Sequence, residues 1–217
     1  TLLCISPKFF ERQLTDMYTQ VVQTENWRLR LIPLVASSIA ETVLGGTVSA
    51  DGEGTLTLHT GAMYGPVSAS FELLDQSPGE SAGAWEDVVE LGARATDSEP
   101  LALVGIFSDS VEVDENDTGA AVLEGGQEYR VRIHVRGRDD SGTDELIEPN
   151  LPARDHLLIQ VWPSVVTEPE VLKMTSAKAK SDDENPEFYS GSGALTLGMG
   201  DPDFEALKAQ SLRDAGE

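Results

Sequence analysis

The feature that most restricts the fold is an apolar residue at every second position, a pattern that begins near Val48 and recurs along the middle of the chain. In residues 129–136, four apolar side chains alternate with three arginines and a histidine. Successive side chains of a strand point to opposite faces, so this run predicts a strand with one buried face. Further apolar runs, separated by turn-forming residues, are 56–58, 67–73, 89–93, 101–107 and 157–162. We expect a mainly β protein, with roughly six to eight strands in an antiparallel β-sandwich.

The N-terminal part of the chain has a different period and predicts helices. In residues 1–21, Ser6 can cap a helix and apolar side chains recur at helical spacing. Residues 27–31 alternate, so a short strand or a helix start is expected before Pro33. A second helix is expected over 34–44, where two glycines follow it.

The C-terminal part is acidic and less regular. Residues 173–193 mix charged residues with Gly, Ser and Pro, which is typical of a linker. Asp201 can then cap a short helix that carries Phe204, Leu207 and Leu212. The expected organisation is an N-terminal helical segment (1–47), a β-sandwich domain (48–166), and an acidic linker with a C-terminal helix (167–217).

Acidity is the dominant property of the composition. The chain has 38 Asp and Glu against 15 Lys and Arg, for a formal net charge of −23. Most of the surplus lies in 48–166, where all the basic residues are arginines. Such a charge repels nucleic-acid phosphates and anionic membranes and attracts basic proteins. We therefore expect a basic protein as the partner and no direct contact with nucleic acid.

The compartment is predicted from cysteine usage and hydropathy. The single cysteine, Cys4, excludes an internal disulfide, which favours the reducing cytoplasm. Residues 1–5 lack the basic flank and apolar length of a signal peptide. The longest apolar stretch, 31–40, is interrupted by Pro and Ser and is shorter than the ~20 residues of a membrane helix. We expect a cytoplasmic protein with no membrane span and leave its oligomeric state open.

No constellation for catalysis or metal binding is found in the sequence. His59, His134 and His156 lack the spacing of local metal ligands, and no serine lies in a nucleophile elbow. Residues 114–119 match the first half of a calcium loop, but Glu124 is displaced from the last ligand position. We predict no catalytic, cofactor or metal residues and a protein that is not an enzyme.

A cationic stripe follows the strand expected at 129–136. On a strand its members share one face. The stripe could receive an anion, or it could pair across strands with acids such as Glu86, Asp87 and Glu90, and pairing is the favoured interpretation. The stripe consists of Arg130, Arg132, His134, Arg136 and Arg138.

Three stretches carry a family resemblance: WEDVVE at 85–90, YRVRIHVRGRD at 129–139 and LIQVWP at 158–163. They resemble a group of uncharacterised actinobacterial proteins, which is in turn distantly similar to the competence J proteins, small acidic cytoplasmic inhibitors of a nuclease. The likeness covers roughly 48–166. It implies an inhibitor or immunity protein, which needs no catalytic residue.

If the resemblance holds, acidic loops would contact the basic active site of the partner. Acidic loops are also common as solvated surface without a partner, so both interpretations stay open. The candidate partner-binding residues are Asp114, Glu115, Asp117, Asp139, Asp140, Asp144, Glu145 and Glu148.

Two other functions remain open. The helices expected at both ends suit an accessory or scaffold subunit of a larger cytoplasmic assembly, such as an antiviral defence complex, held mainly by apolar contacts. Binding of a small molecule at the mouth of the sandwich is suggested by Trp85 and Trp162, although core packing is the favoured role for both.

Overall fold

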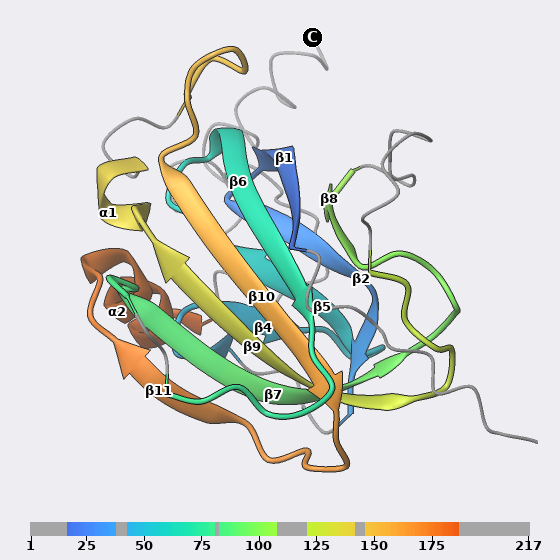
Figure 1. The fold of residues 1–217 in the computed structure, drawn as a ribbon. Coiled ribbons are helices and arrows are strands. Elements are labelled where there is room, and N and C mark those ends of the chain that lie inside the picture. The colour runs from blue at the N-terminus through green and yellow to red at the C-terminus, as the bar shows by residue number, and fades with distance from the viewer. Residues whose placement is uncertain (1–16, 38–42, 81–82, 108–120, 142–145, 187–217) are drawn as a thin grey trace, which may run out of the picture.

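The computed structural model describes residues 17–37, 43–80, 83–107, 121–141 and 146–186, which form a single mixed sheet and two short helices (Figure 1). The mainly β class is confirmed. In chain order the strands are β1 (Tyr18–Glu25), β2 (Arg28–Ala36), β3 (Val43–Leu44), β4 (Val48–Ala50), β5 (Thr55–His59), β6 (Tyr64–Leu73), β7 (Asp87–Ala95), β8 (Ala102–Gly105), β9 (Glu128–Arg136), β10 (Asp155–Pro163) and β11 (Glu170–Met174), and the helices are α1 (Arg138–Ser141) and α2 (Ala177–Glu184).

Six of the strands close into a barrel. The path runs β7-β9-β10-β6-β1-β2, and Leu34 to Ala36 of β2 pair back onto β7. β11 extends the sheet beyond β7, while β5, β4 and β3 extend it beyond β2. β10 pairs with β6 in parallel, so the expectation of a purely antiparallel sandwich is wrong. Alternation in the sequence identifies the buried face of each strand but does not specify which strands pair.

The six strands expected between residues 56 and 162 are confirmed as β5 to β10. Their inward side chains fill the barrel. β9 shows the predicted division of faces, because all four of its apolar side chains belong to the core. The largest fully buried apolar side chains of these strands are Leu56, Leu58, Phe71, Leu91, Leu103, Ile133 and Ile159.

The helices expected within 1–47 are wrong for the described residues of that segment, because β1 and β2 are strands of the barrel. Residues 1–16 lie outside the described residues. Tyr18 and Thr24 of β1 are buried while Val21 is exposed, which is the period of a strand. Tyr, Val and Thr favour strands, and their spacing also fits one face of a helix. Pro33 lies where β2 changes partner from β8 to β7, so the missing N–H interrupts no ladder.

The side chain of Gln20 joins β1 to β8. β1 and β2 pair only beside their hairpin, at Glu25 and Arg28, and β8 pairs with β2. The Gln20 amide nitrogen donates to the Leu103 carbonyl at 2.9 Å, and the Leu103 N–H donates back to the Gln20 amide oxygen at 3.1 Å. The side chain thereby supplies the two hydrogen bonds that a neighbouring strand would make.

Where a linker is expected after Thr167, the chain forms β11 and α2 on the outside of β7 (Figure 1). Ser176 caps α2, as its hydroxyl accepts the Ala179 N–H. α2 approaches the β3–β4 turn so closely that a Cβ on Gly46 would lie 1.9 Å from the Ala179 carbonyl oxygen. The helix expected over 201–212 lies outside the described residues. Among the described helices, none is long and apolar enough to cross a membrane.

A buried ion pair joins these peripheral elements to the barrel. Arg138 and Asp87 are both 0% exposed, and their charged groups meet at 2.5 Å. Arg138 also donates to the Gly46 carbonyl and the Thr47 hydroxyl of the β3–β4 turn. Burial alone would raise the pKa of Asp87, but the charge and hydrogen bonds of Arg138 and the hydrogen bonds of Ser176 together lower it.

Asp87 also accepts hydrogen bonds from the junction between β11 and α2. The Thr175 and Ser176 amides donate to one carboxylate oxygen at 2.8 and 3.1 Å, and the Ser176 hydroxyl donates to the other at 2.6 Å. One carboxylate therefore fixes β7, α1 and the start of α2 in a single arrangement.

Arg138→Met would leave the Asp87 carboxylate buried without its cation. We expect the free energy of unfolding, measured by urea denaturation, to fall by about 3–5 kcal/mol, the usual cost of breaking a buried pair. Arg154→Met removes an exposed arginine and is the matched control, with an expected loss of about 0.5 kcal/mol or less. Equal, small losses in the two variants would contradict the stabilising role of the pair.

A second buried acid, Asp155, should make the stability of the protein depend on pH. Asp155 is 1% exposed and accepts the Gly61 N–H at 2.7 Å, and burial raises its pKa. An acid whose pKa is raised on folding lowers stability as pH rises from the unfolded to the folded pKa, because over this range the unfolded state releases the proton while the folded state retains it. The free energy of unfolding of Asp155→Asn, relative to wild type, should therefore increase between about pH 4 and about pH 8. Denaturation across this range that shows a flat or falling difference would refute the assignment.

Candidate protein-binding surface

The structure describes three of the eight acidic residues expected to bind a partner. Asp139 and Asp140 lie side by side in α1, and Glu148 lies in the loop before β10. All three are exposed. The other five, Asp114, Glu115, Asp117, Asp144 and Glu145, lie outside the described residues.

Asp139 has a structural contact as well as an exposed position. Its two carboxylate oxygens accept the N–H groups of Ala177 and Lys178, each at 2.9 Å, and so stabilise the first turn of α2. The backbone carbonyl of Asp140 accepts a hydrogen bond from Arg154 at 3.3 Å. Loss of binding on substituting Asp139 would therefore not separate a partner contact from a loosened helix.

Cross-strand pairing is confirmed for two arginines of the cationic stripe, while a third, Arg138, pairs with Asp87 from helix α1. Arg130 and Arg132 both bond the carboxylate of Glu90 on β7, the former at 3.0 Å. Opposite charges on neighbouring strands are the usual arrangement on a sheet face.

The remaining contacts of the stripe involve an aromatic ring. The guanidinium of Arg136 lies 5.2 Å from the ring centre of Trp85, within the range of a cation–π interaction. The same indole packs against His134, with 5.4 Å between the ring centres. Glu86 does not pair with an arginine here, because its carboxylate accepts the Gly137 N–H at 2.9 Å.

This face of the sheet is buried, although a solvated face is expected from the sequence. Two segments fold over it: the described residues of the β6–β7 connection (74–80 and 83–86) and the segment after β10 (164–169). The Gly79 carbonyl accepts a hydrogen bond from Arg132 at 2.7 Å, and the Glu168 carbonyl accepts one from Arg130 at 2.5 Å. The charged and aromatic side chains buried beneath this cover are Glu90, Arg130, Arg132, His134 and Trp162.

A hydrogen-bonded chain from His134 through Gln160 to Glu72 lies on the same face. The Gln160 amide nitrogen donates to Glu72 at 2.7 Å, so its oxygen accepts from Nε2 of His134 at 3.0 Å. Burial lowers the pKa of His134 more than the hydrogen bond to Gln160 raises it. The imidazole is thus neutral at pH 7, with its proton on Nε2. Arg130, Arg132 and His134 are therefore held in a polar network beneath this cover, whereas Arg136 is exposed.

The other two histidines lie in separate environments. His59 is fully buried with Nε2 2.9 Å from the Ser49 hydroxyl oxygen, and burial and the charge of Arg138 hold its pKa well below the usual value. His156 is half-buried, and burial and Arg136 lower its pKa. In the part of the chain that the structure describes, no group of three or more His, Cys, Asp or Glu side chains could hold a metal ion.

A second set of exposed acids lies at the opposite end of β9 from α1. We call Asp97, Glu99 and Glu124 the loop-base acids. The two segments that carry them lie side by side, since the Leu123 N–H donates to the Glu99 carbonyl and the Gly125 N–H donates to the Ser98 hydroxyl. The described chain resumes at residue 121 in the second of these segments.

The loop-base acids were not predicted from the sequence, because 97–99 and 124 are distant in sequence and neither forms an acidic run. Only the knowledge that these two segments lie side by side brings their acids together. β9 lies between the loop-base acids and the acids of α1, and the eight steps between its first and last residues span about 26 Å at about 3.3 Å per residue. The exposed acids thus form at least two separate patches on the described surface.

Comparison with known proteins gives two structural likenesses. The crystal structure of ComJ, an inhibitor of the DNA-degrading activity of NucA from Bacillus subtilis, aligns with a TM-score of 0.44 at 11% identity, covering 70% of this chain and 99% of ComJ. A protein described as crocagin biosynthetic gene J gives a TM-score of 0.40 at 12% identity, covering 69% of this chain and 98% of that protein. No family model and no curated protein matches the chain. The resemblance to competence J proteins is therefore confirmed as a weak structural similarity.

Proposed function

We propose that this protein is a non-enzymatic binding module that inhibits a basic protein, such as a nuclease or toxin, through its acidic surface. The observation that carries the proposal is the charge of the exposed side chains. In the described residues, fourteen Asp and Glu side chains are exposed against five Lys and Arg. The nuclease class of the partner comes from the sequence resemblance.

The burial of the arginine stripe strengthens this proposal. Arg130, Arg132 and Arg138 are at most 8% exposed, and each contacts an internal carboxylate. They present little positive charge to a partner. A basic active site approaching this protein would therefore meet a predominantly negative surface, which accelerates association and disfavours acidic competitors.

The buried titratable groups suit structure better than catalysis. Asp87, Asp155 and His59 are at most 1% exposed. A catalytic group must come within hydrogen-bond distance of its substrate. These side chains could reach one only if the barrel opened, so their contacts support a role in holding the fold.

A scaffold subunit is the second candidate, and an exposed apolar patch favours it. Phe107 is 66% and Leu146 is 70% exposed. A series of contacts joins these two residues. The Phe107 N–H donates to the Glu25 carboxylate, Glu25 pairs with Tyr64 between β1 and β6, and Tyr64 forms an isolated β-bridge with Leu146. A neighbouring subunit could cover this apolar patch, defined as Phe107, Tyr64 and Leu146.

The two functions differ in how binding depends on salt and on charge. The full chain would be used to capture its partner from cells, and association would be measured between about 50 mM and about 500 mM salt. For an inhibitor we expect the association rate to fall at least about 10-fold over this range. Neutralising the loop-base acids with D97N, E99Q and E124Q should slow association at low salt, and the captured partner should regain nuclease activity.

The control for the triple variant is L146S, which makes the apolar patch more polar and leaves the net charge unchanged. An inhibitor bound through acids should tolerate it. Binding that is insensitive to salt and to the triple variant, but lost in L146S, would replace the inhibitor with the scaffold subunit. Cleavage or modification of a substrate by the purified protein alone would overturn the non-enzymatic assignment.

A further inference from the structure

We propose that a pocket between the β6–β7 connection and β11 binds a small anionic amphiphile, a molecule with a flat apolar body and one carboxylate or similar group. This ligand site goes beyond the proposed inhibition and uses different residues. The pocket has a volume of about 580 Å³, within the usual range for small-molecule sites. The residues that line it come from four places in the chain: Pro78, Gly79 and Glu80; Gly83, Trp85 and Val88; Arg132; and the β11 pair Leu172 and Lys173.

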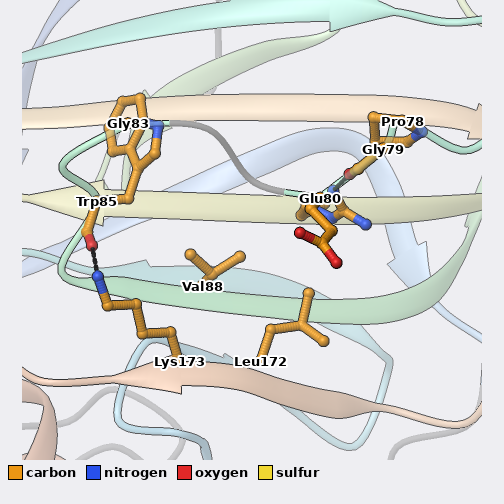
Figure 2. A pocket seen from close by; sticks show the side chains of 9 residues that line it. Pro78, Gly79, Glu80, Gly83, Trp85, Val88, Leu172 and Lys173 are labelled. Atoms are coloured by element: carbon orange, nitrogen blue, oxygen red, sulfur yellow. Dashed lines mark hydrogen bonds between the residues drawn. The ribbon is translucent and has the colours of Figure 1, made fainter.

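The walls of the pocket can hold an apolar body. Figure 2 shows Val88 between Trp85 on one side and Glu80 on the other, with Leu172 projecting toward the same space from β11. Leu172 is 42% exposed, so its side chain is accessible to a ligand in the pocket. It lies at an irregularity in the pairing of β11 with β7, between Val171 and Lys173. The irregularity places two successive side chains, Leu172 and Lys173, in the lining of one pocket.

The indole of Trp85 is held in place by its neighbours. Arg136 lies over the ring and His134 packs against it, as described above. Its backbone carbonyl accepts a hydrogen bond from the Lys173 ammonium at 2.5 Å (Figure 2). A ring fixed in this way offers an aromatic surface without a large loss of side-chain entropy on binding.

The charges around the pocket favour an anion. Arg130 and Arg132 share the one carboxylate of Glu90, so these three side chains together carry one surplus positive charge. Arg132 lines the pocket. Its guanidinium has five N–H donors, one of which bonds Glu90 and another the Gly79 carbonyl.

Lys173 adds a second cation to the lining. Its ammonium has three donors, and one of them bonds the Trp85 carbonyl. Glu80 is the single acid of the lining and is exposed. Two cations against one carboxylate give the pocket a local charge opposite to that of the whole chain. A cation would be the expected ligand if the net charge of −23 alone decided binding.

The test compares three naphthalene probes of equal shape: 2-naphthoate, neutral 2-naphthamide and cationic 2-naphthylmethylamine. The full chain would be titrated in about 0.5 M salt, where screening limits long-range attraction by the net charge to a few ångströms. The indole N–H signal of Trp85, assigned with Trp85→Phe, reports binding. We expect naphthoate to bind at least about five-fold more tightly than the amide, and the amine to bind most weakly.

Variants of the two exposed lining charges give opposite expected signs. Lys173→Met should weaken naphthoate about five-fold, and Glu80→Gln should tighten it by a similar factor. Lys180→Met removes an exposed lysine outside the lining and should leave affinity unchanged. Equal affinity for all three probes, preference for the amine, or binding unaffected by both lining variants would overturn the site. None of these results bears on inhibition through the loop-base acids, so the two proposals fail separately.

Discussion

The guanidinium of Arg138 and the carboxylate of Asp87 meet 2.5 Å apart in the interior, and the rest of the structure is arranged around this contact. Each ion is costly to remove from water, so the pair requires a full set of hydrogen bonds. The β3–β4 turn provides acceptors for Arg138, and the β11–α2 junction provides donors for Asp87. Segments that are far apart in sequence are thereby fixed on one side of the barrel.

A second polar network lies on the outer face of β7, β9 and β10, and its charged groups are likewise paired or hydrogen-bonded. Glu90 joins two arginines, and Gln160 joins His134 to Glu72. Beneath the β6–β7 connection, Arg130 and Arg132 of the stripe pair with Glu90, the pairing that the sequence favoured. The exterior is left with a large excess of exposed carboxylates, which is the physical basis of the proposed binding to a basic protein.

Strands β5, β6, β7, β9 and β10 were predictable because apolar side chains recur at every second position, and β8 because it is a short continuous apolar run. β1 was not, since Tyr18 and Val21 fit a helical spacing as well as a strand. β11 was hidden by the irregularity between Val171 and Lys173, which breaks the period of two. Closure by β2 on β7 and the burial of the arginine stripe depend on contacts between distant segments, which local pattern does not encode.

The central claim is that the Asp87 contacts make the β11–α2 junction part of the same cooperative unit as the barrel. Native-state hydrogen exchange at the Thr175 and Ser176 amides, which donate to Asp87, tests it most directly. The account predicts that both amides exchange only with global unfolding, with the same free energy and denaturant dependence as core amides of β9. Exchange of these two amides by local opening, while β9 stays protected, would contradict it.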